Sequence, residues 1–251
     1  MGKRKNNKTQ NQIVSIIVTI LVIVFGYFGA DIYNSYVGAD STSYATTQVQ
    51  ILSFDLNEVP EFDGKTPYVV INNNISNFTD EEMTTNSFEN YSELDSLGRC
   101  GIAYANICKE IMPNEPRGEI GQVKPSGWKL AKYDIVDGKY LFNRCHLIGY
   151  QLAGENANVK NLITGTRYLN VTGMLPFENE VADYVKQTSN HVLYRVTPIF
   201  KETNLVASGV QIEAKSVEDN GKGVEFNVYI YNNQPGVEIN YANGESYLIS
   251  Q

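Results

Sequence analysis

The stretch NRCHLIGYQLAGENANVKNLITGTRYLN, residues 143–170, contains one of only two histidines in this chain of 251 residues. His146 follows Arg144 and precedes two asparagines, Asn161 and Asn170, which lie nine residues apart. A neutral imidazole accepts protons near neutral pH because its unperturbed pKa is about 6.5. His146 is therefore a candidate general base, although the residue types alone also allow a structural histidine beside turn-forming asparagines.

The polar residues of this stretch suit the hydrolysis of a phosphodiester. That reaction needs a group that takes a proton from water, a cation that neutralises the developing charge, and a group that holds the phosphate. His146 would be the base. Mg²⁺, which often takes only one or two protein oxygens, would be the cation, with the carboxamide oxygen of Asn170 as its ligand. The planar guanidinium of Arg144 or Arg167 would hold the phosphate.

The sequence on both sides of this stretch predicts an α+β fold with a largely antiparallel sheet. Apolar and polar residues alternate in three C-terminal segments, which we expect to be consecutive antiparallel strands: 191–200, 205–217 and 224–233. Earlier strands are predicted within 68–75, 98–107 and 139–154. Apolar residues at helical spacing predict a helix over 177–187, with Pro176 suited to its first turn.

Two polar segments give weaker predictions. Residues 80–91 are expected to form a short helix or a loop, because they show no clear apolar periodicity. Residues 113–129 contain three prolines and three glycines, which predict loops around a short strand. Trp128 in this segment is expected to anchor a packed loop, and His191 at the start of a strand is expected to be structural.

The charge balance argues against broad electrostatic binding of nucleic acid. The formal net charge is −8, and four of the 20 basic residues lie in the first eight positions. The remainder carries 16 basic against 28 acidic residues, a net charge of −12. A polyanionic partner would need a metal ion or a local basic patch. The candidate members of such a patch are Arg117, Lys124, Lys129, Lys132, Lys160 and Arg167.

The N-terminus predicts a membrane anchor. Residues 13–30 form an uncharged apolar run that is long enough to span a bilayer, and basic residues precede it. We therefore expect a single-pass protein of the cell membrane with its larger part outside. The predicted parts are a cytoplasmic basic tail (1–11), a transmembrane helix (12–30), a stalk (31–60) and a catalytic domain (61–251). The alternative is a secreted protein whose signal peptide is cleaved near VGA at 37–39.

The three cysteines, Cys100, Cys108 and Cys145, predict neither a zinc site nor a redox motif. They show no CxxC spacing, and at most two of them can pair within the chain. We expect them to be small buried side chains, as unpaired cysteines usually are.

The order and spacing of the polar residues resemble a known family. NRCH, residues 143–146, is similar to the Asp-Arg-Gly-His signature of the DNA/RNA non-specific endonucleases, also called ββα-metal or His-Me finger nucleases. The resemblance implies that His146 is the general base and that Asn170 is the direct Mg²⁺ ligand, with Mn²⁺ as a substitute. It is densest over 139–187 and extends loosely, toward anchored Gram-positive members, from about residue 60 to the C-terminus.

The same resemblance assigns roles to the remaining polar residues. Arg144 matches the signature arginine, and Asn161 would position the phosphate or the catalytic loop. Glu178 would hold a metal-bound water, with Glu180 as the alternative. The reaction implied is a metal-dependent hydrolysis of DNA or RNA of low sequence specificity, with 5′-phosphate products. Arg167 and Lys160 are the further candidates for binding substrate.

Two departures from the family pattern leave structural alternatives open. Asn143 replaces the signature carboxylate and Cys145 replaces the signature glycine, which costs backbone strain if that position needs a positive φ. Pro176 lies between Asn170 and Glu178 and removes a backbone donor. The helix there is either kinked, or Asn170 lies in a separate preceding turn.

The expected protein is an anchored nuclease whose partners are DNA or RNA and the membrane, with no obligate protein partner. Two alternatives remain at this stage. A non-catalytic surface module that binds cell wall or nucleic acid would fit the acidic balance and the altered signature. A different hydrolase would need a nucleophile next to one of the two histidines, and no GxSxG motif supports it.

Overall fold

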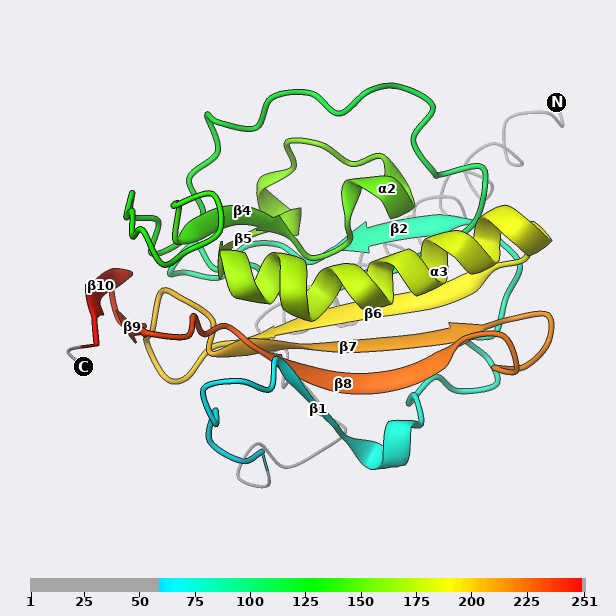
Figure 1. Cartoon of the computed structure of the whole chain (residues 1–251). Coiled ribbons are helices and arrows are strands. Elements are labelled where there is room, and N and C mark those ends of the chain that lie inside the picture. Colours follow the sequence, from blue (N-terminus) through cyan, green and yellow to red (C-terminus); the bar gives the residue numbers. More distant parts are fainter. Residues whose placement is uncertain (1–58, 250–251) are drawn as a thin grey trace, which may run out of the picture. The chain divides into compact units, whose positions relative to one another are not determined.

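A six-stranded antiparallel sheet forms the centre of the protein in the computed structural model, which describes residues 59–249. The strand order is β1-β8-β7-β6-β3-β2, as Figure 1 shows. The bounds are Tyr68–Val70 (β1), Phe88–Tyr91 (β2), Ala103–Ile107 (β3), Val192–Ile199 (β6), Gly209–Ser216 (β7) and Glu225–Tyr231 (β8).

The three longest strands confirm the alternation in the sequence. In β6, β7 and β8 the residues Val196, Ile212 and Val228 are paired in register, and all three are buried. Branched side chains pack well on a pleated surface, so neighbouring strands of this composition stabilise one another. The three predicted C-terminal strands are therefore correct, and they occupy the middle of the sheet.

A separate hairpin carries the signature residues. Strand β4, Phe142–His146, pairs antiparallel with β5, Leu162–Thr166, so that Cys145 lies opposite Ile163. The connection between them contains a short helix α2, Tyr150–Ala153, and a 3₁₀ turn η3, Val159–Asn161. Two smaller elements lie elsewhere: the 3₁₀ turn η2, Asn72–Asn74, and the hairpin of β9, Val237–Asn240, with β10, Glu245–Leu248.

A π-helical turn precedes the long helix and resolves the question raised by Pro176. Residues Tyr168–Met174 (η4) form this wide turn, which runs directly into α3, Leu175–Thr188. The N–H of Leu175 donates to the carbonyl of Asn170, five residues back, as in a π-helix. Pro176 lies in the first turn of α3, where a backbone donor is not needed. Asn170 therefore lies in the preceding turn, without a break in the helix.

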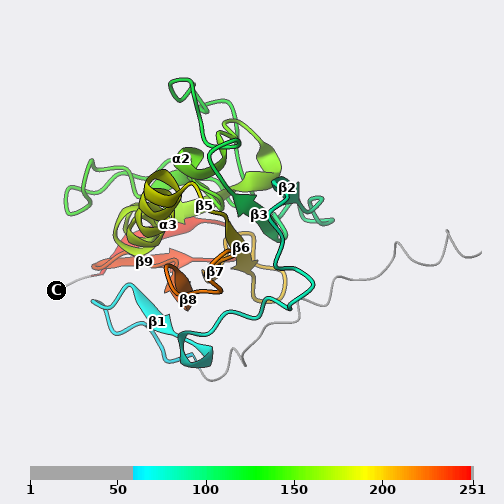
Figure 2. The ribbon, with the colours of Figure 1, turned by 90° about the vertical axis from the view of Figure 1, so that its right-hand side faces the viewer.

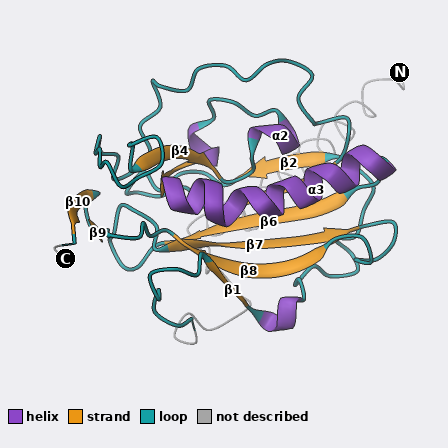
Figure 3. Cartoon of the chain, in the orientation of Figure 1, coloured by secondary structure: helices purple, strands orange, loops and turns teal. Residues whose placement is uncertain are grey.

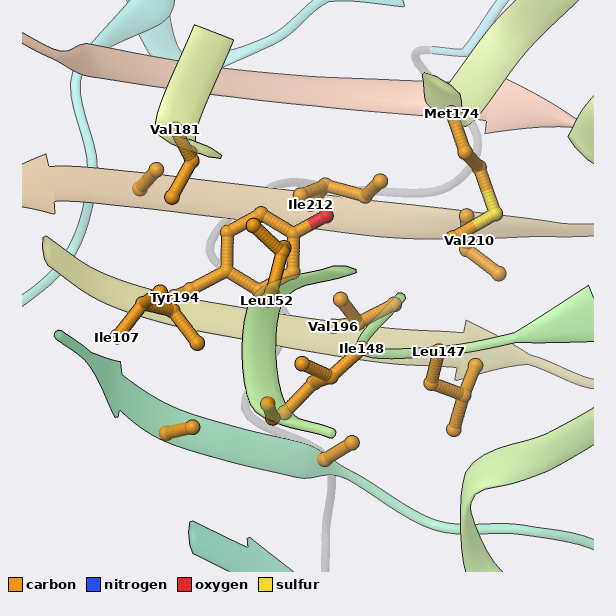
Figure 4. Packing of buried hydrophobic residues seen from close by; sticks show 14 of the residues in the cluster. Ile107, Leu147, Ile148, Leu152, Met174, Val181, Tyr194, Val196, Val210 and Ile212 are labelled. Atoms are coloured by element: carbon orange, nitrogen blue, oxygen red, sulfur yellow. The ribbon is translucent and has the colours of Figure 1, made fainter. Parts of the chain in front are cut away.

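The main core lies between α3 and the sheet. Figures 1 and 2 show α3 running along one face of the sheet, with α2 on the same side, and Figure 3 shows how few helices the fold contains. Val181, Ala182 and Val185 are buried on α3 at helical spacing, which is the face turned to the sheet. Figure 4 shows this cluster, in which Leu152 from α2 and Tyr194 from β6 are also completely buried.

Several sequence expectations were wrong or lie outside the described residues. Strand β2 occupies the end of the segment 80–91, because pairing with β3 overrides its polar local sequence. No strand forms within 113–129, which consists of turns and irregular loops.

The predicted tail (1–11) and transmembrane helix (12–30), with the stalk up to residue 58, lie outside the described residues. Among residues 59–249, none of the helices has the length and apolar character needed to cross a bilayer.

Gly173 provides a test of how closely η4 packs on the sheet. A Cβ at this position would overlap the Cγ2 atom of Ile230 on β8. Alanine in a helix normally stabilises by about 0.5–1 kcal/mol relative to glycine. We expect Gly173→Ala instead to lower the free energy of unfolding by about 1–3 kcal/mol, because overpacking outweighs that gain. Urea unfolding measures the change. Gly121→Ala is the control, since a Cβ there meets no atom within 4 Å, and a stabilised Gly173→Ala protein would contradict the packing.

Candidate functional site

His146 lies at the end of β4 with both ring nitrogens in contact with other groups. Its Nε2 lies 2.7 Å from the backbone carbonyl oxygen of Asn156, and a carbonyl can only accept, so Nε2 carries the proton. Nδ1 is then the nitrogen with the free electron pair. It accepts a hydrogen bond from Nη2 of Arg117 at 3.3 Å. The ring is therefore held in one tautomer, with Nδ1 as its acceptor.

The surroundings of His146 keep its imidazole neutral. Burial lowers the pKa of His146 to about 4, and the charge of Arg117 acts in the same direction, while the Asn156 carbonyl opposes both. The folded state therefore binds this proton less readily than the unfolded chain, whose histidine titrates near 6.5. The resulting contribution to stability is present above about pH 6.5 and is lost as the pH falls through about 4.

Asn161 fixes the loop that follows His146. Its Oδ1 accepts from the backbone N–H of Ile148 at 2.9 Å, and its Nδ2 donates to the carbonyl of the same residue at 3.0 Å. The side chain is completely buried. Because both ends of the carboxamide are used, Asn161 holds the loop and contributes no free group to a phosphate.

The Asn170 carboxamide faces the hairpin. Its Nδ2 donates to Oδ1 of Asn143 at 3.1 Å, and its Oδ1 accepts from the thiol of Cys145 at 3.2 Å. Asn143 thus keeps the acceptor function of the carboxylate that it replaces. Asn170 thereby contacts two residues of β4, Asn143 and Cys145, which precede His146 in the same strand.

Cys145 replaces the signature glycine without backbone strain. It is part of the regular strand β4 and is not among the residues with a positive φ. Space for its side chain comes from Gly165 on β5, where a Cβ would lie 2.5 Å from the Cβ of Cys145. All three cysteines are free and buried, as the sequence predicted.

Glu178 is a carboxylate on the apolar stripe of α3. It is only 8% exposed and lies against Gly149, where a Cβ would come within 2.6 Å of Oε2. Burial raises the pKa of Glu178 to about 7, although a hydrogen bond from Gln151 and the charge of Arg117 both lower it. Glu180, the alternative from the sequence, lies on the exposed side of α3. Glu178 is therefore the carboxylate that faces the hairpin region.

The remaining predicted site residues are engaged elsewhere. Arg144 donates to the carbonyls of Val123 at 2.5 Å and Gly121 at 2.6 Å. Its guanidinium also lies 4.1 Å from the ring centroid of Trp128. It therefore anchors the loop 113–129, with Trp128 as the packed anchor that the sequence predicted.

Two further predicted substrate-binding cations are paired with exposed carboxylates. Arg167 donates two hydrogen bonds to Asp137, the shorter at 2.8 Å, and Lys160 lies 2.5 Å from Glu93. Such surface pairs contribute little to stability, about 0–1 kcal/mol, so a phosphate could displace the carboxylate. In this structure neither cation contacts His146.

Comparison with known proteins identifies the family. The model of the DNA/RNA non-specific endonuclease family matches residues 76–218, which is more than half of the chain. The match includes all the predicted site residues. The chain belongs to the DNA/RNA non-specific endonuclease family. It is an endonuclease, which sets aside the binding module and the serine hydrolase that the sequence left open.

Solved structures of similar nucleases support this membership. NucA from Streptococcus agalactiae with a magnesium ion bound is 30% identical, with a TM-score of 0.64 over 72% of this chain and 87% of NucA. The metal-free form of NucA is 28% identical, with a TM-score of 0.65 over 77% and 92%. The Sda1 nuclease with a bound zinc ion is 26% identical, with a TM-score of 0.60 over 74% and 97%. Structures of two similar nucleases thus contain a divalent metal.

The donor groups of this endonuclease fit a hard divalent cation. Within residues 59–249, His, Cys, Asp and Glu side chains form no cluster of three that could hold a metal ion. Of the residues that the resemblance assigns to the metal site, Asn170 offers a carboxamide oxygen and Glu178 a carboxylate. Mg²⁺ suits such a set, since it keeps several waters and takes few protein oxygens. The raised pKa of Glu178 indicates a buried carboxylate whose charge Arg117 does not fully balance.

Sequence reasoning missed part of this site in the endonuclease. Arg117 was only one of six candidate basic residues, yet it alone among them contacts His146. It lies 29 positions before the histidine in a loop without periodicity, so no local spacing indicates it. The sequence indicated at position 143 only the loss of the signature carboxylate, although Asn143 orients Asn170. The NRCH match could have indicated that role, because an amide oxygen accepts as a carboxylate does.

The buried charge of Glu178 predicts a pH-dependent gain of stability on its removal. The folded-state pKa of about 7 exceeds the ordinary value of 4.5, so ionisation costs stability as the pH rises through about 7. We expect Glu178→Gln to raise the free energy of unfolding by about 1–3 kcal/mol at pH 8.5 in EDTA, and by much less at pH 5. Urea unfolding at both pH values measures this. Glu180→Gln is the exposed control, and a pH-independent difference would contradict the assignment.

Proposed function

We propose that this endonuclease hydrolyses phosphodiester bonds of DNA or RNA with His146 as the general base. The observation that carries the proposal is the fixed tautomer of the ring. The Asn156 carbonyl occupies Nε2–H, so Nδ1 keeps the electron pair that removes a proton from water. The lowered pKa supports the role, because the imidazole is neutral at pH 7 and available as an acceptor.

Arg117 changes its hydrogen-bond partner when substrate binds. In the structure its guanidinium donates to Nδ1, the atom that must receive the proton. A phosphate entering the site offers this cation a better acceptor, since guanidinium and phosphate form strong paired hydrogen bonds. Arg117 then binds substrate and releases Nδ1 for water. Arg144 keeps the loop that carries Arg117 in place through its bonds to Gly121 and Val123.

Asn170 would hold Mg²⁺ directly, with Mn²⁺ as a substitute, and Glu178 would hold a water bound to that metal. Asn143 fixes the orientation of the Asn170 carboxamide by accepting from its Nδ2, and the Asn170 oxygen lies against the Cys145 thiol. When bound, the cation supplies positive charge to the phosphate oxygens and to the departing 3′ oxygen. Water attacks phosphorus as its proton passes to Nδ1 of His146. The bond from phosphorus to the 3′ oxygen breaks, and the departing oxygen takes a proton from a second water, which leaves a 5′-phosphate and a 3′-hydroxyl.

Low sequence specificity follows from the groups available for contact. Arg117, Arg167 and Lys160 offer cations that suit phosphate, and phosphate contacts carry no base identity. Arg167 and Lys160 must first leave their carboxylate partners, Asp137 and Glu93. Both ion pairs are exposed, and such pairs are weak.

The apolar segment 13–30 supports an anchored, outward-facing location for the catalytic domain. Basic residues precede this segment, which favours a cytoplasmic N-terminus with residues 31–251 outside. An extracellular nuclease would meet DNA and RNA released by other cells. The three buried free cysteines are compatible with that oxidising side, because buried thiols are inert.

Replacement of the general base should abolish cleavage without unfolding the protein. We expect His146→Ala to lower kcat for plasmid cleavage by at least about 10²–10⁴-fold, the usual contribution of general-base catalysis. A plasmid nicking assay on residues 40–251 with Mg²⁺ measures this, and circular dichroism checks the fold. His191→Ala is the matched control, since His191 pairs with Glu218 away from these residues. Full activity in His146→Ala would refute the assignment.

Removal of divalent metal should stop the reaction reversibly. We expect EDTA to bring plasmid cleavage to background and an excess of Mg²⁺ or Mn²⁺ to restore it, because Asn170 and Glu178 cannot neutralise the transition state alone. EDTA already saturated with Mg²⁺ is the control for effects of the chelator itself. Cleavage that continues undiminished in EDTA would rule out the metal role.

A further inference from the structure

The hydroxyl of Tyr194 is a buried polar group without an evident purpose in the fold. Tyr194 belongs to β6, in the middle of the sheet, and is completely buried. Figure 4 shows its ring surrounded by Leu152, Val181 and Ile212. Within the described part of the chain, its Oη has no hydrogen-bond partner.

An unpartnered hydroxyl in such a position is costly. Water is lost on burial and no protein group replaces it, which destabilises the folded state. Phenylalanine would fill the same apolar space without that cost. A native protein that keeps a buried donor of this kind usually uses it for something other than packing.

The neighbours of the hydroxyl belong to the active site. Burial first, and then the nearby Glu178 carboxylate, raise the pKa of Tyr194 well above its ordinary value. The phenol therefore remains protonated and can serve as a donor. Cys145 is the second neighbour, and its buried thiol stays protonated. Glu178 lies one turn from Val181 on the buried stripe of α3, and Val181 borders the Tyr194 ring. The orphaned hydroxyl thus lies within electrostatic reach of the buried carboxylate.

Of the two neighbours, Glu178 is the better acceptor. The thiol of Cys145 already contacts Oδ1 of Asn170 and the sulfur of Met174. An ionised carboxylate has about four acceptor sites, and hydrogen bonds to it are roughly twice as strong as those between neutral groups. Glu178 has Gln151 and Arg117 as its other stabilising neighbours, which leaves acceptor capacity for one more donor.

We propose that Tyr194 is a positioning residue of the active site. Its hydroxyl donates to the Glu178 carboxylate, directly or through one water, in the enzyme that carries its divalent cation. This inference rests on the proposed function, in which Glu178 helps to hold that cation. The hydroxyl would orient the carboxylate, which Gln151 also contacts. Tyr194 does not touch substrate.

The test removes only the hydroxyl. We expect Tyr194→Phe to lower kcat for plasmid cleavage about 5- to 50-fold with KM changed less than twofold, since substrate contacts remain. The dissociation constant for Mn²⁺, measured by electron paramagnetic resonance on protein without nucleic acid, should rise about 3- to 10-fold, consistent with the loss of one charge-assisted hydrogen bond. The Tm in EDTA should be unchanged or higher. A lower Tm in EDTA would give the hydroxyl a structural role and overturn the proposal.

Two comparisons sharpen the result. Tyr231→Phe removes a hydroxyl that donates to the Pro60 carbonyl at 2.7 Å, and should leave both kcat and Mn²⁺ affinity unchanged. In a Glu178→Gln protein, Tyr194→Phe should cause no further loss, because the acceptor charge is already absent. Equal losses in both backgrounds, or wild-type kcat and Mn²⁺ affinity in Tyr194→Phe alone, would overturn the proposal.

The outcomes also separate this inference from the proposed function. A normal Tyr194→Phe enzyme beside an impaired Glu178→Gln enzyme would overturn only the role of Tyr194. A fully active Glu178→Gln protein, or a wild-type protein that cleaves equally well without metal, would overturn the proposed function and the role of Tyr194 with it.

Discussion

The burial of one carboxylate on the apolar stripe of α3 explains more of the active site than any other feature. Glu178 occupies a position at which helical periodicity calls for an apolar side chain, and its pKa is near 7 as a result. Gly149 lacks a side chain because the carboxylate fills that space, and Gln151 and Arg117 offset the cost of the charge. A buried carboxylate whose charge is not fully balanced would favour the binding of a cation beside it.

The acidic balance of the chain is compatible with a nuclease because the cations are placed locally. Two of the candidate substrate-binding residues, Arg167 and Lys160, are held by exposed carboxylates, and Arg117 is held by the histidine. Each of these contacts is weak enough for a phosphate to replace. An acidic chain does not favour nucleic acid overall, so the proposed binding would depend on these few cations.

The sequence predicts the parts of this structure whose causes are local. Strands β6, β7 and β8 follow from alternation, and α3 follows from apolar spacing after Pro176, because burial of one face enforces a single period. His146, Asn170 and Glu178 could be selected by order and spacing. Strand β2 could not be predicted, because pairing with β3 decides it. The π turn at Asn170 could not be predicted either, because packing against Ile230 decides it. Arg117 was missed as a contact of His146 for the same reason: a loop held by Arg144 brings it there from a distance.

The free state of all three cysteines has a consequence for where this enzyme can become active. A fold without cross-links needs no oxidant or isomerase to reach its native form, so it can mature in a reducing or an oxidising compartment alike. Redox conditions therefore offer no means of keeping the folded nuclease inert through its thiols.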